Sequence, residues 1–221
     1  MLKKETINYI RNLTNNNNKP WFDENRGALE EAKFDFESLV KEIIASLGRV
    51  DPDIASLEAK NCIFRQYRDV RFSKDKTPYK QHMGASFDRG GKSSGFAGYY
   101  LHIEPGNKSM AGGGIWMPDG IALKKIRQEI DYSCNEFLEI INEASFKRIF
   151  GGLAEGEFKL SREPKGYARD NPAIEYLKLK SFVATQPLAD DELTSKDLLQ
   201  KIIAAFTALM PLIKFINRSL E

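Results

Sequence analysis

Apolar residues recur every three to four positions through the first fifth of the chain, which is the period of an amphipathic helix. Ile7, Ile10 and Leu13 share one face of a short helix over residues 4–14. A second helix is predicted over residues 20–47, with Asn18 as its N-cap. Its apolar face comprises Leu29, Ala32, Phe36, Leu39, Val40, Ile43, Ile44 and Leu47, and Gly48 follows as a C-cap.

The middle third of the chain changes to the alternating period of β-strands. Strands are predicted near residues 62–65, 82–88, 97–104 and 109–116. Turn-forming residues separate the last three of them, at 88–91 and 105–107. Consecutive strands with short turns indicate an antiparallel meander.

The last third contains both periods. A helix is predicted over 118–142 with a break near Ser133, and a final helix opens at Thr194 with Asp197 in the capping-box position. A further helix start follows Pro172, and short strands are predicted at 158–160 and 182–184. The whole pattern predicts a single α+β domain over residues 1–221, in which a mainly antiparallel sheet is covered by the long N-terminal and C-terminal helices.

Composition supports a folded protein with a substantial core. The chain has 221 residues, of which 42% are hydrophobic and 11% aromatic. Its two cysteines, Cys62 and Cys134, are too few for a disulfide framework or a four-thiolate zinc site. The N-terminus shows no apolar signal segment, and the most apolar stretch, residues 202–213, is too short to span a bilayer. We therefore expect a cytoplasmic protein with no membrane segment.

Charge is nearly balanced overall but not locally. Lys and Arg total 33 against 31 Asp and Glu, a net charge of +2. This balance argues against a dedicated nucleic-acid or membrane binder. Residues 61–120, however, contain nine basic and five acidic residues, so the positive excess lies in the middle third.

Most of that excess falls in residues 65–80, a connection between two predicted strands that has no apolar period of its own. Long connections are often functional, and arginines and lysines are suited to hold carboxylate or phosphate. We expect this segment to bind a small phosphate- or carboxylate-bearing ligand through Arg65, Arg68, Arg71, Lys76 and Tyr79. Asp69 would orient an arginine or act as a base.

Two other interpretations of the basic segment remain open. It could be an internal salt-bridge network, in which Asp69 and Asp75 clamp the basic side chains and the protein is structural. It could also be a nucleic-acid-binding patch, which the near-zero net charge makes the weaker alternative. The sequence indicates no cofactor and does not predict an oligomeric state.

The same segment carries a motif, Arg-x-x-Arg-Asp-x-Arg-Phe-x-x-x-Lys-x-Pro-Tyr, whose fixed positions run from Arg65 to Tyr79. In this motif the chain resembles an uncharacterised conserved bacterial protein family, domain of unknown function 2461. The resemblance extends over nearly the whole chain but implies no established activity. In a later segment the family has histidine before a proline, and this chain has Asn171 there. A role that depends on that histidine does not carry over.

Candidate catalytic and metal-binding residues are few. His82 follows the basic segment and could act as an acid or base. His102 lies on the same face of its strand as Tyr100, and the two histidines would share a sheet face if their strands align. No His-x-x-x-His or Asp-x-Asp spacing is present, so no metal site is predicted. Gly112–Gly114 lets a ligand or another backbone approach closely, as a floor of the site or as a bulged edge strand.

Overall fold

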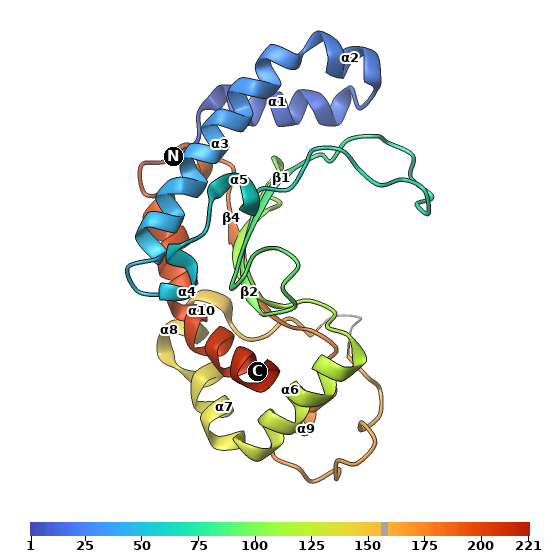
Figure 1. Ribbon diagram of the computed structural model, residues 1–221, viewed down its shortest axis with the longest axis vertical. Helices are drawn as coiled ribbons and strands as arrows, with labels where there is room; N and C mark the ends of the chain where they lie inside the picture. The colour runs from blue at the N-terminus through green and yellow to red at the C-terminus, as the bar shows by residue number, and fades with distance from the viewer. Residues whose placement is uncertain (156–158) are drawn as a thin grey trace.

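Four antiparallel strands in the order β1-β2-β3-β4 form the centre of the computed structural model, which describes residues 1–155 and 159–221 (Figure 1). The strands are β1 (Met83–Asp88), β2 (Gly98–Ile103), β3 (Ser109–Ile115) and β4 (Phe182–Leu188). Ser86 of β1 lies opposite Tyr100 of β2, Tyr100 lies opposite Gly112 of β3, and Gly112 lies opposite Thr185 of β4. The predicted α+β class and antiparallel sheet are confirmed.

One face of the sheet, here called the covered face, packs against the longest helices. These are α3 (Arg26–Leu47) and α10 (Leu198–Leu220), which lie on the same side of the sheet in Figure 1. Phe206 of α10 contacts the rings of Phe87 and Tyr99, and all three residues are fully buried. The predicted coverage by long N-terminal and C-terminal helices is thereby confirmed, and the opposite side is called the open face.

The N-terminal helices follow the predicted pattern with one correction. α1 spans Lys4–Asn15, and Asn18 caps α2 (Lys19–Glu24) by accepting a hydrogen bond from the Trp21 N–H at 3.1 Å. The prediction of one continuous helix over 20–47 is wrong, because the chain forms two helices, α2 and α3 (Arg26–Leu47), which are separated at Asn25. Both the side-chain amide and the backbone N–H of Asn25 donate to the Trp21 carbonyl, which ends α2 and redirects the chain into α3.

The first predicted strand, at 62–65, is also wrong. The segment begins with the end of a short helix, α5 (Ala59–Cys62), and Ile63 makes only an isolated bridge to Ala85. Beyond it the chain leaves the sheet and pairs with its own returning segment, Tyr67 opposite Tyr79. β4, which includes the predicted strand at 182–184, supplies the fourth strand instead.

The remaining helices surround one end of the sheet. The predicted break at Ser133 is confirmed, since it separates α6 (Gly120–Tyr132) from α7 (Cys134–Asn142). α8 (Ala144–Phe150) and α9 (Ile174–Leu177) follow, and α4 (Pro52–Ala55) precedes the sheet. The expected strand at 158–160 begins on a residue outside the described ones, and Lys159 makes an isolated bridge with Leu179.

The C-terminal helix begins later than predicted. Glu192–Thr194 forms a 3₁₀ turn, and α10 starts at Leu198 after Asp197, whose side chain makes no capping hydrogen bond. Within the described residues α10 is the one helix long and apolar enough to cross a membrane by length and composition. Half of its most apolar window is buried in the fold, where Leu209, Leu212 and Ile216 belong to the core.

Candidate functional site

The basic segment forms an arm that extends from the edge of the sheet, as Figure 1 shows in teal. We use "the arm" for residues 65–80. Its two halves pair as a ribbon, with the Arg68 N–H donating to the Pro78 carbonyl at 2.9 Å and the Lys80 N–H donating to the Gln66 carbonyl at 2.8 Å. The arm therefore has a base at residues 65–67 and 79–80 and a tip around residues 70–76.

The base of the arm is fixed to the N-terminal helices. The ring of Tyr79 is buried and stacks on Phe22 of α2, with centroids 3.7 Å apart. The side-chain amide of Asn17 binds the same residue twice, accepting from the Tyr79 N–H at 3.1 Å and donating to its carbonyl at 2.9 Å. Tyr79, an expected ligand-binding residue, thus anchors the arm.

At the tip, the arginines have carboxylate partners within the arm. Arg71 forms a two-point pair with the Asp69 carboxylate at 2.7 and 3.0 Å, and this pairing lowers the pKa of Asp69. Arg68 contacts Asp75 at 2.5 Å. Hydrogen bonds from Thr77, then Arg68, lower the pKa of Asp75 to about 2.

Two lysines near the base of the arm contact the same aromatic ring. Lys80 and Lys92 lie over the ring of Phe64 with their Nζ atoms 5.0 and 5.1 Å from its centroid. Burial lowers the pKa of Lys80, and the neighbouring charges of Arg65 and Lys92 lower it further. We call Arg65, Lys80 and Lys92 the cationic rim; within the described part of the chain none of the three forms an ion pair with a carboxylate.

Phe64 also lines a cavity on the open face of the sheet. The cavity has a volume of about 730 Å³. Most of its lining is apolar or aromatic. Besides four glycines it comprises Phe64, Phe96, Tyr100, Met110, Ile115, Trp116, Met117, Pro118, Ala122 and Val183 together with Ser86, Asp88, Asp119 and Thr185. A concave apolar site with a few convergent polar groups is the usual form of a small-molecule site.

The space for this cavity follows from glycines on the two central strands. Gly98 lies opposite Gly114, so no side chain rises from that cross-strand pair. Gly113 and Gly114 line the cavity, and Gly114 has φ of 119°. A Cβ on Gly114 would lie 1.9 Å from the Phe182 carbonyl oxygen. The alternative interpretation of Gly112–Gly114 as a bulged edge strand is wrong, because β3 pairs with β2 on one side and with β4 on the other.

Asp88 is the most unusual polar group in the cavity. Its carboxylate accepts a hydrogen bond from the Ser86 hydroxyl at 2.7 Å. Burial raises the pKa of Asp88, although the Ser86 hydrogen bond and Lys92 act in the opposite direction. A carboxyl group in an apolar cavity with a raised pKa can exchange a proton or orient a ligand donor.

Further along the open face, the strand register brings the two histidines together. Their ring centroids lie 4.2 Å apart. Tyr100 OH lies 3.2 Å from His102 Nδ1, and His102 Nε2 lies 3.1 Å from Glu104 Oε2. Burial, then the neighbouring His102 and Lys80, lowers the pKa of His82 to about 4, so His82 is uncharged at neutral pH. The expectation that both histidines share a sheet face is confirmed.

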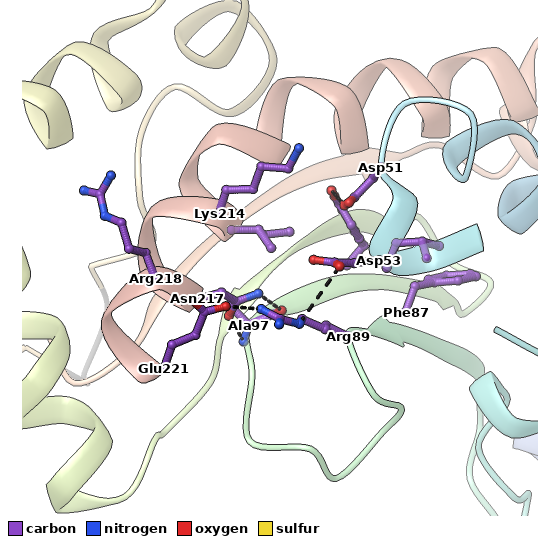
Figure 2. Close-up of a pocket in the computed structure, with 12 residues that line it drawn as sticks. Asp51, Asp53, Phe87, Arg89, Ala97, Lys214, Asn217, Arg218 and Glu221 are labelled. Atoms are coloured by element: carbon purple, nitrogen blue, oxygen red, sulfur yellow. Dashed lines mark hydrogen bonds and ion pairs between the residues drawn. The ribbon is translucent and has the colours of Figure 1, made fainter. Parts of the chain in front are cut away.

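A second cavity, of about 210 Å³, lies at the C-terminal end of α10 (Figure 2). Its polar groups largely bind one another. Arg89 pairs with Glu221, Asn217 binds both backbone groups of Ala97, and the buried Asp51 accepts from Tyr99 OH at 2.6 Å. This cavity ties the helix to the sheet. Its lining includes the basic residues Arg89, Lys214 and Arg218, of which Arg89 and Arg218 pair with carboxylates.

The structure therefore divides the residues expected from sequence. Arg65 is at the base of the arm and follows Phe64, which lines the cavity. Arg68, Asp69, Arg71 and Lys76 are on the outer part of the arm, where Lys76 donates to the Val70 carbonyl at 2.9 Å. Sequence reasoning missed other residues of the site, namely Phe64, Lys80, Lys92 and Asp88. The signal for them was weak, because Lys92 and Asp88 flank an ordinary turn and only the fold brings that turn to the arm.

Comparison with known proteins gives one family. The family model described as a conserved hypothetical protein, DUF2461, matches residues 5–215. No curated protein and no solved structure matches the chain.

Proposed function

This chain belongs to the conserved hypothetical protein family DUF2461, and we propose that its function is to bind a small organic anion in the open-face cavity. The ligand has an apolar, preferably planar, body that occupies the cavity. Its carboxylate or phosphate group faces the cationic rim of Arg65, Lys80 and Lys92. The proposal retains the ligand class expected from the sequence and moves its site from the whole arm to the base of the arm.

The observation that carries the proposal is the cationic rim itself. Lys80 and Lys92 lie over the ring of Phe64, which lines the apolar cavity, and Arg65 is near enough to lower the pKa of Lys80. The described residues provide none of the three with an ion pair. Burial and the neighbouring charges of Arg65 and Lys92 both oppose the charged form of Lys80 in the free protein. An anion bound at the rim would relieve the repulsion, so its binding energy would exceed that of the same contacts on a neutral surface.

The arm's outer arginines are a weaker site for the same ligand. Arg68 and Arg71 already hold Asp75 and Asp69, and Arg71 remains 76% exposed. An anion that bound there would compete with these carboxylates and with water. Charges of this kind contribute little to affinity.

Asp88 gives the cavity a second point of recognition. Its carboxyl group lies within the same lining as Tyr100 and Thr185. A hydroxyl or amine on the ligand body would donate to Asp88 while the anionic group is held at the rim. Two separate polar contacts in an apolar cavity fix a ligand's orientation.

Thermal unfolding with paired ligands tests the proposal. Aromatic carboxylates and phosphates are compared with their neutral amide or alcohol analogues, each at millimolar concentration and constant ionic strength. We expect acids that fit to raise the Tm, because a ligand that binds only the folded state stabilises it. Neutral analogues of the same shape should give a smaller shift.

Substitutions in the cationic rim and at the tip of the arm then locate the site. Lys80→Met and Lys92→Met remove charge and keep an unbranched side chain, and they should abolish the shift that the acids cause. Arg71→Met removes a charge at the tip and should leave the shift unchanged. If Arg71→Met abolishes the shift and the lysine variants preserve it, the anion binds at the tip and the proposal is wrong.

A further inference from the structure

His82, His102 and Glu104 form a compact cluster beside the cavity. One nitrogen or oxygen atom from each of the three lies within 4.8 Å of the corresponding atoms of the other two. His102 and Glu104 come from β2 and its end, whereas His82 directly precedes β1. Because Met83 of β1 pairs with Ile103 of β2, the residues that flank this pair are drawn to the same edge of the sheet.

The separations in this cluster suit ligands of a single ion. Ligand atoms about 2.0–2.2 Å from a shared zinc ion lie roughly 3–3.5 Å from each other. His102 Nε2 and Glu104 Oε2 are 3.1 Å apart. The same distance also fits a hydrogen bond between them, so the neighbouring groups decide between the two interpretations.

The neighbouring residues hold the three side chains by hydrogen bonds, as the residues around a metal site hold its ligands. Tyr100 OH lies 3.2 Å from His102 Nδ1, where it can accept that proton and leave Nε2 with a free lone pair. Lys108 Nζ contacts the other oxygen of Glu104, Oε1, at 3.0 Å and leaves Oε2 facing the histidine. Gln66 donates to the His82 carbonyl at 3.3 Å and fixes its backbone.

We propose that His82, His102 and Glu104 bind a divalent first-row transition metal ion, with Zn²⁺ as the favoured ion. Two imidazoles and one carboxylate are a common donor set for zinc, and they leave a coordination position for water or a ligand atom. Neutral imidazole is the form of histidine that binds metal. Tyr100 contacts His102 and also lines the cavity, so the metal would lie next to the proposed ligand site.

This inference does not depend on the proposed anion binding. The chain contains only two histidines, which makes the test direct. Untagged protein, freed of metal with a chelator, is titrated with ZnCl₂ by calorimetry, and the bound metal is counted by mass spectrometry after dialysis. We expect one Zn²⁺ per chain. Side-chain ¹⁵N NMR of the wild-type protein should show both histidines changing together as the ion binds.

Variants with matched controls complete the experiment. His82→Gln, His102→Gln and Glu104→Gln should each weaken Zn²⁺ binding by at least tenfold, in a fold that circular dichroism shows to be intact. Glu139→Gln makes the same charge change at an exposed position of α7, and Cys134→Ser removes the more accessible thiol. Both controls should bind as the wild type does. The proposal is overturned if wild-type Zn²⁺ binding leaves either histidine spectrum unchanged, if Cys134→Ser abolishes it, or if no stoichiometric binding occurs.

Discussion

The carboxylate of Asp88 occupies the space that a side chain at Gly98 would need. The two residues lie opposite each other in the β1–β2 ladder, and a Cβ on Gly98 would come within 1.9 Å of Asp88 Oδ1. The absence of a side chain at Gly98 therefore allows Asp88 to turn into the cavity. The position of the Asp88 carboxylate in the cavity therefore depends on glycine at position 98.

Replacing this glycine should destabilise the fold. Gly98→Ala forces the Asp88 carboxylate to move and also brings the new Cβ within 2.8 Å of the Phe87 carbonyl. We expect a loss of about 1–3 kcal/mol in the free energy of unfolding. Gly27→Ala is the matched control, since no atom crowds that position on the exposed part of α3 and alanine favours a helix. Urea denaturation should show opposite signs for the two variants.

The raised pKa of Asp88 makes a pH-dependent prediction. Its folded pKa lies above its usual value of 3.8, so the folded state holds this proton more tightly. The corresponding stability is present below pH 3.8 and is lost as the pH rises through the folded pKa. The side chain of Asp88→Asn stays neutral at every pH. The stability of this variant relative to the wild type should therefore increase as the pH rises from acidic to neutral.

Asp75 provides the comparison of opposite sign. Its pKa is lowered to about 2, so its stabilising contribution is present above pH 3.8 and is lost as the pH falls towards 2. The difference in free energy of unfolding between Asp75→Asn and the wild type should therefore stay constant between pH 5 and pH 7. Urea melts in the presence of a chelator at several pH values measure both differences. A constant difference for Asp88→Asn over the whole range would contradict the assignment.

The attachment of the arm rests on Asn17. Asn17→Ala removes two hydrogen bonds to the Tyr79 backbone, at a net cost of about 1–3 kcal/mol in the local opening of the arm. Amide hydrogen exchange at Arg68 and Lys80, whose N–H groups cross the ribbon, should accelerate by roughly tenfold to a hundredfold. Asn15→Ala, at an exposed position two residues away, should leave those rates unchanged.

The covered face is tested by two phenylalanines of one helix. Phe36 is fully buried, whereas Phe34 is 69% exposed. Phe36→Ala should cost about 3–5 kcal/mol, because it removes a buried ring and leaves a cavity. Phe34→Ala should change the free energy of unfolding by less than about 0.5 kcal/mol. Equal effects would show that the buried face of α3 is wrongly assigned.

The fold could be predicted from sequence where burial is periodic. Phe36, Leu39, Ile43 and Leu47 are buried as their helical spacing predicts, and alternation along β1 and β2 places Phe87 and Tyr99 in the core. The break at Asn25 could not be predicted in the same way. It depends on one side chain that competes for the Trp21 carbonyl, and the apolar spacing before and after it resembles one long helix.

The site was less accessible to sequence reasoning, because its parts are brought together by strand register. The motif identifies Arg65. However, the arginines on the outer arm pair with carboxylates, whereas Lys80 at its base has no ion pair among the described residues, and this difference depends on how the arm folds on itself. Lys92 lies next to the start of the arm, where its ammonium group donates to the Ile63 carbonyl at 2.5 Å and lies over the ring of Phe64. His82 and His102 show no metal-binding spacing along the chain, and their proximity arises across two strands.

The central claim is that the open-face cavity holds a ligand whose anionic group meets the cationic rim. A crystal structure of the protein with an aromatic acid selected by thermal unfolding tests it most directly. We predict that the apolar body lies between Phe64 and Met110, with the anionic oxygens about 2.7–2.9 Å from the Nζ atoms of Lys80 or Lys92. A ligand bound at Arg68 and Arg71 on the tip, with the cavity occupied by water, would contradict the account.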